Sequence, residues 1–126
     1  MKTAHSCVAA LLVLVLSGCA SSHTVMPFQL TDADEVVIKA GVRTSLVNPG
    51  SAEFGDVRAT RSTDGVVSVC GWVNSKNGVG RYTGNQLFIG LLNVATRPSI
   101  FTLTAISTPE QQTAITLRCQ KAGITL

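Results

Sequence analysis

The start of the chain most constrains what the rest can fold into. Residues 1–6 carry Lys2 and no acid, residues 8–16 form a run of nine apolar residues, and small residues follow. This order is typical of a secretory signal, and the apolar run is too short for a membrane-spanning helix, which needs about 20 residues. We therefore expect residues 1–18 to be removed. The remaining 108 of 126 residues suit a single exported domain.

The signal ends in Leu16-Ser17-Gly18-Cys19, which resembles the lipobox of bacterial lipoproteins. The resemblance implies cleavage before Cys19 and attachment of a diacylglycerol to its thiol, with further acylation such as palmitate. Each buried CH₂ contributes about 0.8 kcal/mol, so two or more chains give a lasting membrane anchor. The residue after Cys19 is Ala20. Inner-membrane lipoproteins resemble one another in having Asp at this position, so Ala20 favours the periplasmic face of the outer membrane in a Gram-negative source. An ordinary signal peptide beside an incidental cysteine is the alternative.

The composition indicates a strand-rich exported domain and gives no sign of a nucleic-acid partner. Charged residues make up 13% of the chain, about half the usual share. The formal net charge is +3, and it falls to +2 when Lys2 is removed with the signal. Such a small, dispersed charge is ordinary for a solvated surface.

Two of the four cysteines remain available for pairing. Cys7 lies in the signal and Cys19 is the predicted lipid site, which leaves Cys70 and Cys119 in an oxidising compartment. We predict one disulfide between them, worth about 4 kcal/mol for a loop of this length; two buried thiols are the alternative. The mature chain has only His23 and no CxxC spacing, so we expect no metal site and no cofactor.

The hydrophobic pattern predicts an α+β domain over residues 31–126, preceded by a lipidated tether over residues 19–30. A helix over 31–47 should begin at Thr31 and bury a stripe of apolar residues. Asp64-Gly65 predicts a hairpin between strands 57–63 and 66–73, and the second of these, apolar on both faces, should be central. Strands 87–94, with Gly90 marking a bulge or a close approach, and 99–106 follow. A helix from Thr108 to about Lys121 should end at Gly123. The stripe consists of Val36, Val37, Ala40, Thr44 and Val47.

We expect these elements to form two layers. An antiparallel sheet of about four strands would carry the N-terminal and C-terminal helices on one face, because this arrangement buries both apolar stripes most simply.

The chemistry of the chain argues against an enzyme. No serine or cysteine has a histidine partner outside the tether, and no phosphate-binding glycine loop is present. The polar segment 74–86 is the best candidate for a binding surface, because Tyr, Trp and Arg are enriched at binding hot spots. Its alternative is a connector whose asparagines cap their own backbone while the aromatic rings enter the core. The candidate residues are Trp72, Asn74, Lys76, Asn77, Arg81 and Tyr82.

The run Cys70-Gly71-x-Val73-Asn74-x-Lys76-Asn77, followed by Gly80-x-Tyr82-x-Gly84, resembles a group of small exported bacterial proteins of unknown function. A helix ending near Asn48-Pro49 and the run Ser51-Ala52-Glu53-Phe54 extend the resemblance over most of residues 31–90. It implies a shared fold and supplies no activity. Arg81 stands where such sequences often have glycine, so a shared use of the loop does not follow.

Together these observations predict a lipid-anchored cell-envelope protein that is a non-catalytic binding or structural module presenting the 74–86 loop to an envelope or cell-wall partner. One alternative is a small-ligand binder with a pocket lined by Trp72 and Tyr82. Another is an inhibitor of a cell-wall-degrading enzyme such as a lysozyme, because small exported lipoproteins with a protruding loop resemble such inhibitors.

Overall fold

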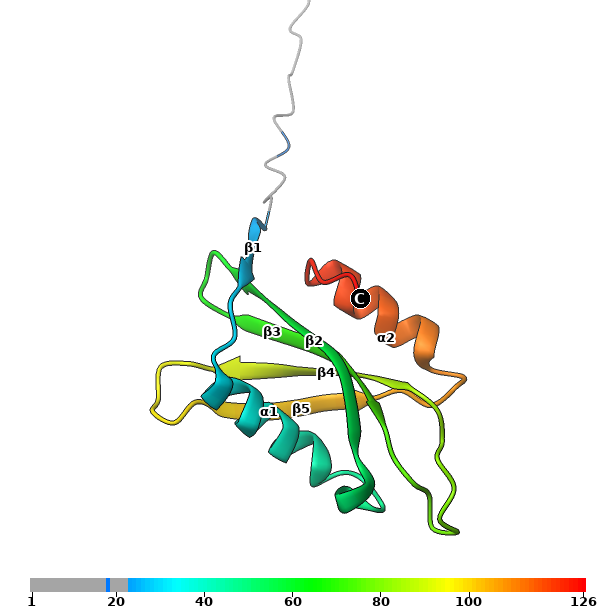
Figure 1. The fold of residues 1–126 in the computed structure, drawn as a ribbon. Helices are drawn as coiled ribbons and strands as arrows, with labels where there is room; N and C mark the ends of the chain where they lie inside the picture. Colours follow the sequence, from blue (N-terminus) through cyan, green and yellow to red (C-terminus); the bar gives the residue numbers. More distant parts are fainter. Residues whose placement is uncertain (1–17, 19–22) are drawn as a thin grey trace, which may run out of the picture.

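The computed structural model describes Gly18 and residues 23–126, and it contains an antiparallel five-stranded sheet with a helix on either side (Figure 1). The expected α+β architecture with flanking helices is confirmed. The predicted signal, apart from Gly18, and the lipid site Cys19 lie outside the described residues. The elements, in chain order, are β1 (Val25–Phe28), α1 (Asp32–Arg43), the 3₁₀ helix η1 (Pro49–Ser51), β2 (Glu53–Ser62), β3 (Val67–Asn74), β4 (Gln86–Asn93), β5 (Ile100–Ile106) and α2 (Gln112–Lys121).

The fifth strand, β1, comes from the range that the sequence assigns to the tether. It pairs with the end of β2, with Val25 opposite Ser62 and Phe28 opposite Ala59. Its sequence gives no strand pattern because it is four residues long and contains Pro27, which an edge strand tolerates. The folded domain therefore includes residues from Val25 onward.

The two helices lie on opposite faces of the sheet, so the domain has three layers where the sequence predicts two. Val67, Val69 and Val73 of β3 pack with α1 in one buried cluster. Cys70, from the other face of the same strand, packs with α2 in a second cluster. The strand order β1-β2-β3-β4-β5 makes β3 the central strand, as predicted, and a helix on each face explains why both of its faces are apolar.

Most of the predicted apolar stripe of α1 is wrong, because the helix is rotated relative to it and, of its members, Val37 alone packs against the buried cluster. Val36 is 66% exposed and Val47, which lies beyond the end of the helix, is 76% exposed, whereas Ile38 and Val42 are fully buried. A Cβ on Gly41 would lie 2.6 Å from the Phe101 ring, so the glycine lets the helix approach β5 closely on this side. The helix ends at Arg43, and Pro49 begins η1 after it.

The predicted bridge between Cys70 and Cys119 is present, and it joins the centre of the sheet to α2. The end of the chain continues from α2 toward β2, where Thr60 donates a hydrogen bond to the Ala122 carbonyl and Arg58 donates one to the Thr125 carbonyl. Gly123 ends the helix with a positive φ, as predicted. The disulfide and these contacts hold α2 against one half of its face of the sheet.

The register gives the sheet two distinct ends, which are visible in Figure 1. At the first, here called the entry end, Val25 lies opposite Ser62, and the 63–66 turn and the 94–99 loop connect strands. At the second, the hairpin end, Glu53 lies opposite Asn74 and the 74–86 segment joins β3 to β4. The polar segment that the sequence singles out is thus at the end farthest from the start of β1.

Candidate functional site at the 74–86 hairpin

Residues 74–86 form a structured extension of the β3–β4 hairpin. Lys76 and Tyr82 form an antiparallel bridge. The Thr83 amide donates to the Ser75 carbonyl at 3.0 Å, and the Asn77 amide donates to the Arg81 carbonyl at 2.7 Å. These bonds give the segment a defined backbone shape up to its tip.

Asn74 and Asn77 use their side-chain oxygens to hold that shape. Asn77 Oδ1 accepts hydrogen bonds from the amides of Val79 and Arg81, both at 3.0 Å. Asn74 Oδ1 accepts one from the Gly84 amide at 3.1 Å. Asparagine commonly stabilises turns in this way. For these two predicted binding residues the structure favours the backbone-capping alternative.

Lys76 and Tyr82 are linked to the edge of the sheet at the hairpin end. The Tyr82 hydroxyl donates to Glu53 Oε1 at 3.1 Å, and Lys76 Nζ lies 5.5 Å from the centre of the Tyr82 ring. The hydrogen bond to Glu53, with some burial and the charge of that carboxylate, raises the pKa of Tyr82 above its ordinary value of 10.0. The phenol therefore remains a neutral donor near neutral pH, and it braces the hairpin against β2.

At the tip of the hairpin, the side chains of Val79 and Arg81 are exposed and make no hydrogen bond with the described residues. Val79 is 83% exposed, and the ion pairs of the described residues, Lys39–Glu35 and Arg58–Asp56, do not involve Arg81. The residue types of the segment predict Arg81 as a contact residue but do not single out Val79. The exposure of Val79 could have been expected from its position between Gly78 and Gly80, since a lone apolar residue flanked by glycines in a polar loop has little chance of burial.

Trp72 lies apart from the exposed tip. It is half-buried on the α2 side and lines a hollow of about 50 Å³ with residues of α2 and the C-terminal segment, and Tyr82 is not among the lining residues. Small-molecule sites usually measure about 300–1,000 Å³. The predicted set of six residues therefore divides: Trp72 belongs to the α2 interface, and the other five belong to the hairpin.

The hairpin offers recognition by shape, apolar contact and hydrogen bonding. Within the described residues, no group of three or more His, Cys, Asp or Glu side chains is arranged to hold a metal ion. No helix in this part of the chain is long and apolar enough to cross a membrane.

Comparisons of the chain with protein-family models, with curated proteins and with solved structures find no match.

Proposed function

We propose that the protein is a lipid-anchored cell-envelope protein that binds another macromolecule through the tip of its 74–86 hairpin, without catalysing a reaction. The observation that carries this proposal is the combination of a fixed backbone with unengaged side chains at Val79 and Arg81. A surface already ordered before binding loses less conformational entropy on association. Arginine is also enriched among residues that dominate binding energy.

The position of the hairpin supports the proposal. A lipid at Cys19 would hold the protein from the entry end of the sheet, where β1 starts. The tip of the hairpin lies beyond the other end of β3, a strand of eight residues, which spans about 25 Å at the usual rise per residue. An anchor at one end would therefore direct the tip away from the bilayer, toward an envelope protein or the cell wall.

The anchor is tested by mass spectrometry of the mature N-terminal peptide from the full-length chain expressed in its own envelope. The proposal predicts a peptide that begins at Cys19 and carries a diacylglycerol. A mature chain that begins at another residue, or an unmodified Cys19, would contradict it.

The hairpin is tested by recovering envelope proteins that co-purify with the lipidated chain. Replacing Val79 with serine and Arg81 with alanine should remove a specific partner, with at least a tenfold loss of recovery. Val36→Ser is the matched control, because Val36 is an exposed apolar residue on α1. Full recovery of every partner by the Val79 and Arg81 double variant would refute this use of the hairpin.

An inhibitor of a cell-wall-degrading enzyme is one form of the same proposal, with a lysozyme as the partner. A protruding hairpin can enter the cleft of such an enzyme. The assay is cell-wall hydrolysis in the presence of excess protein. Unchanged hydrolysis would exclude the lysozyme tested as the partner.

A further inference from the structure

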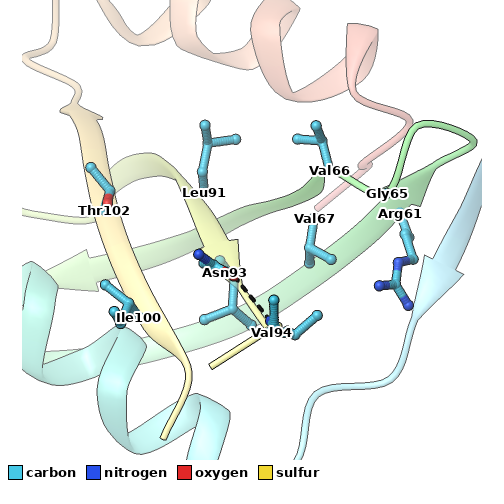
Figure 2. A pocket seen from close by; sticks show the side chains of 11 residues that line it. Arg61, Gly65, Val66, Val67, Leu91, Asn93, Val94, Ile100 and Thr102 are labelled. Atoms are coloured by element: carbon cyan, nitrogen blue, oxygen red, sulfur yellow. Dashed lines mark hydrogen bonds between the residues drawn. The ribbon is translucent and has the colours of Figure 1, made fainter. Parts of the chain in front are cut away.

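A second exposed surface lies at the entry end of the sheet, on the same face as α2. It is a hollow of about 460 Å³ (Figure 2). The side chains of Val66 and Leu91 point to the same side of the sheet in this view. Val66, Leu91 and Ile100, all of which line the hollow, are 43%, 47% and 55% exposed.

The register explains why these apolar side chains are uncovered. Val67 pairs with Leu92, and Asn93 pairs with Ile100, so Val66 and Ile100 lie on either side of Asn93 in one row across the sheet. The buried cluster under α2 is built on Cys70, Leu87 and Ile89, nearer the hairpin end. The helix therefore covers one half of this face, and none of the described residues covers the other half.

Another exposed apolar side chain, Met26, lies at the same end but on the α1 face, because Met26 pairs with Arg61 and Arg61 pairs with Val67 of the α1 cluster. An adjoining hollow of about 290 Å³ is lined by Met26 and Pro27 of β1, and Arg61 lines both hollows. The charged side chains at this end leave a net charge of only −1, because Arg61 and Arg97 stand against Asp32, Asp34 and Asp64. An attraction of this end to a partner would therefore come from apolar contact more than from net charge.

We infer that the entry end is a membrane-contacting surface, seated in the interfacial region of the bilayer that holds the lipid anchor. The inference rests on the proposed lipidation of Cys19. Six residue steps separate Cys19 from Val25, and a fully extended chain spans at most about 3.6 Å per residue. The entry end therefore stays within about 20 Å of the anchored residue, so a weak apolar contact with the bilayer becomes an intramolecular event.

The chemistry of this end fits the bilayer interface. Exposed apolar groups gathered in one place favour a protein or membrane contact. Arg61, whose guanidinium lies 5.7 Å from the centre of the Phe28 ring, can cover apolar surface with its stem while its charged head reaches the phosphate layer. Because the net charge here is small and not positive, the contact should form on zwitterionic lipids without needing anionic ones.

The test places a tryptophan reporter at each end of the lipidated full-length chain. In a Trp72→Phe background, Ile100→Trp reports on the entry end and Val79→Trp, at an apolar position that is even more exposed, is the control. Each protein is reconstituted into phosphatidylcholine vesicles with plain or brominated acyl chains. Bromine should lower the emission of the I100W variant at least twofold, both without added salt and in 0.5 M salt. The emission of the V79W variant should stay within a tenth of its original intensity.

The outcomes separate this inference from the function on which it rests. Failure of the chain to float with vesicles would contradict the anchor itself. Flotation with an unquenched I100W variant would overturn the membrane contact and leave the anchor standing. If the wild-type chain self-associates in detergent and this association buries the surface, the inference would also be overturned. The surface would then bind a second copy of the chain.

A second reporter guards against misfolding of the Trp72→Phe background. The Val66→Trp variant keeps Trp72. The quenching at position 66 is therefore the loss of emission beyond the loss that the wild-type chain shows. Quenching of the V66W variant to the level of the wild-type chain alone would contradict the contact.

Discussion

The two ends of the sheet are connected by the same strands but expose different chemistry. At the hairpin end, polar groups serve the backbone, and Asn74 and Asn77 hold a long connection in one shape. At the entry end the connections are short and four apolar side chains are exposed around two adjoining hollows: Met26, Val66, Leu91 and Ile100. Exposed apolar residues therefore have to be interpreted by their position: a lone valine on a shaped polar tip suits a specific partner, and a group of apolar side chains suits a bilayer.

The disulfide gives the largest expected effect, because it keeps one half of the α2 face covered. Replacing Cys70 and Cys119 with alanine should lower the free energy of unfolding by about 4 kcal/mol, since the bridge joins residues 49 apart in sequence and constrains the unfolded chain. Urea unfolding of the oxidised protein provides the measurement, and reduction of the wild type should give a similar loss. A change below about 1 kcal/mol would show that α2 is held by packing alone.

Asp34 gives the next largest effect, and it acts at the entry end. Its carboxylate accepts hydrogen bonds from the Thr31 amide, the Thr31 hydroxyl and the Ser99 hydroxyl at 3.0, 2.8 and 2.7 Å. Asp34→Ala should cost about 2 kcal/mol, because hydrogen bonds to a charged group are the stronger ones and the cap of α1 is lost. Asp32→Ala, at an exposed acid in the same helical turn, is the matched control. Equal stability of the two variants would contradict this role of Asp34.

The same residue sets a pH dependence. The hydrogen bond from Ser99, with those from Thr31, lowers the pKa of Asp34 below its ordinary value of 3.8. Because the folded pKa is lower than the unfolded one, this stabilisation is complete at neutral pH and declines as the pH falls below that value. The free energy of unfolding, measured from neutral to acid pH, should therefore decrease less in the D34A variant than in the wild type. An identical pH dependence of the two would refute the assignment.

Asn77 tests the hairpin end with a smaller effect. Asn77→Ala removes two hydrogen bonds at an exposed tip and should cost about 1 kcal/mol. Hydrogen exchange should accelerate at the amides of Val79 and Arg81 and stay unchanged in β1. Asn85→Ala, at an exposed position in the same segment, should leave these amides protected. Faster exchange throughout the sheet would mean that the tip is not an independent unit.

The exposed apolar residues of the entry end give the smallest effect on folding. Replacing Val66 and Ile100 with serine should change the free energy of unfolding in detergent by about 0.5 kcal/mol or less, as at other exposed sites. In vesicles the wild type should unfold at a higher temperature than in detergent, because binding to the folded state stabilises it. The double variant should lose this increase. An equal increase in both proteins would argue against the contact.

The sequence predicts those features that local chemistry decides. The Thr31 cap, the turn at Asp64-Gly65 and the Cys70–Cys119 pair all follow from residue type and spacing, and the structure contains them. Gly90 marks both a register shift and a close approach to the Phe101 ring, where a Cβ would lie 2.4 Å from it. The backbone-capping role of Asn77 is likewise a local property.

Features that depend on contacts between residues far apart in the chain could not be predicted from the sequence. β1 has no strand pattern of its own and exists because β2 offers an edge to pair with. The rotation of α1 depends on Gly41 meeting Phe101, a residue 60 positions away. The side of the sheet that α2 occupies depends on which face of β3 carries Cys70. The exposure of Val79 and of the entry-end apolar side chains depends in turn on where the helices lie.

In the proposed arrangement, the entry end faces the bilayer and the hairpin end faces a macromolecular partner. A photo-crosslinking amino acid placed at position 79 or at position 100 of the full-length chain, in its own envelope, tests both halves together. We expect lipid adducts from position 100 and a discrete protein adduct from position 79 that is lost on Arg81→Ala. Lipid adducts from position 79, or the same adducts from both positions, would contradict it.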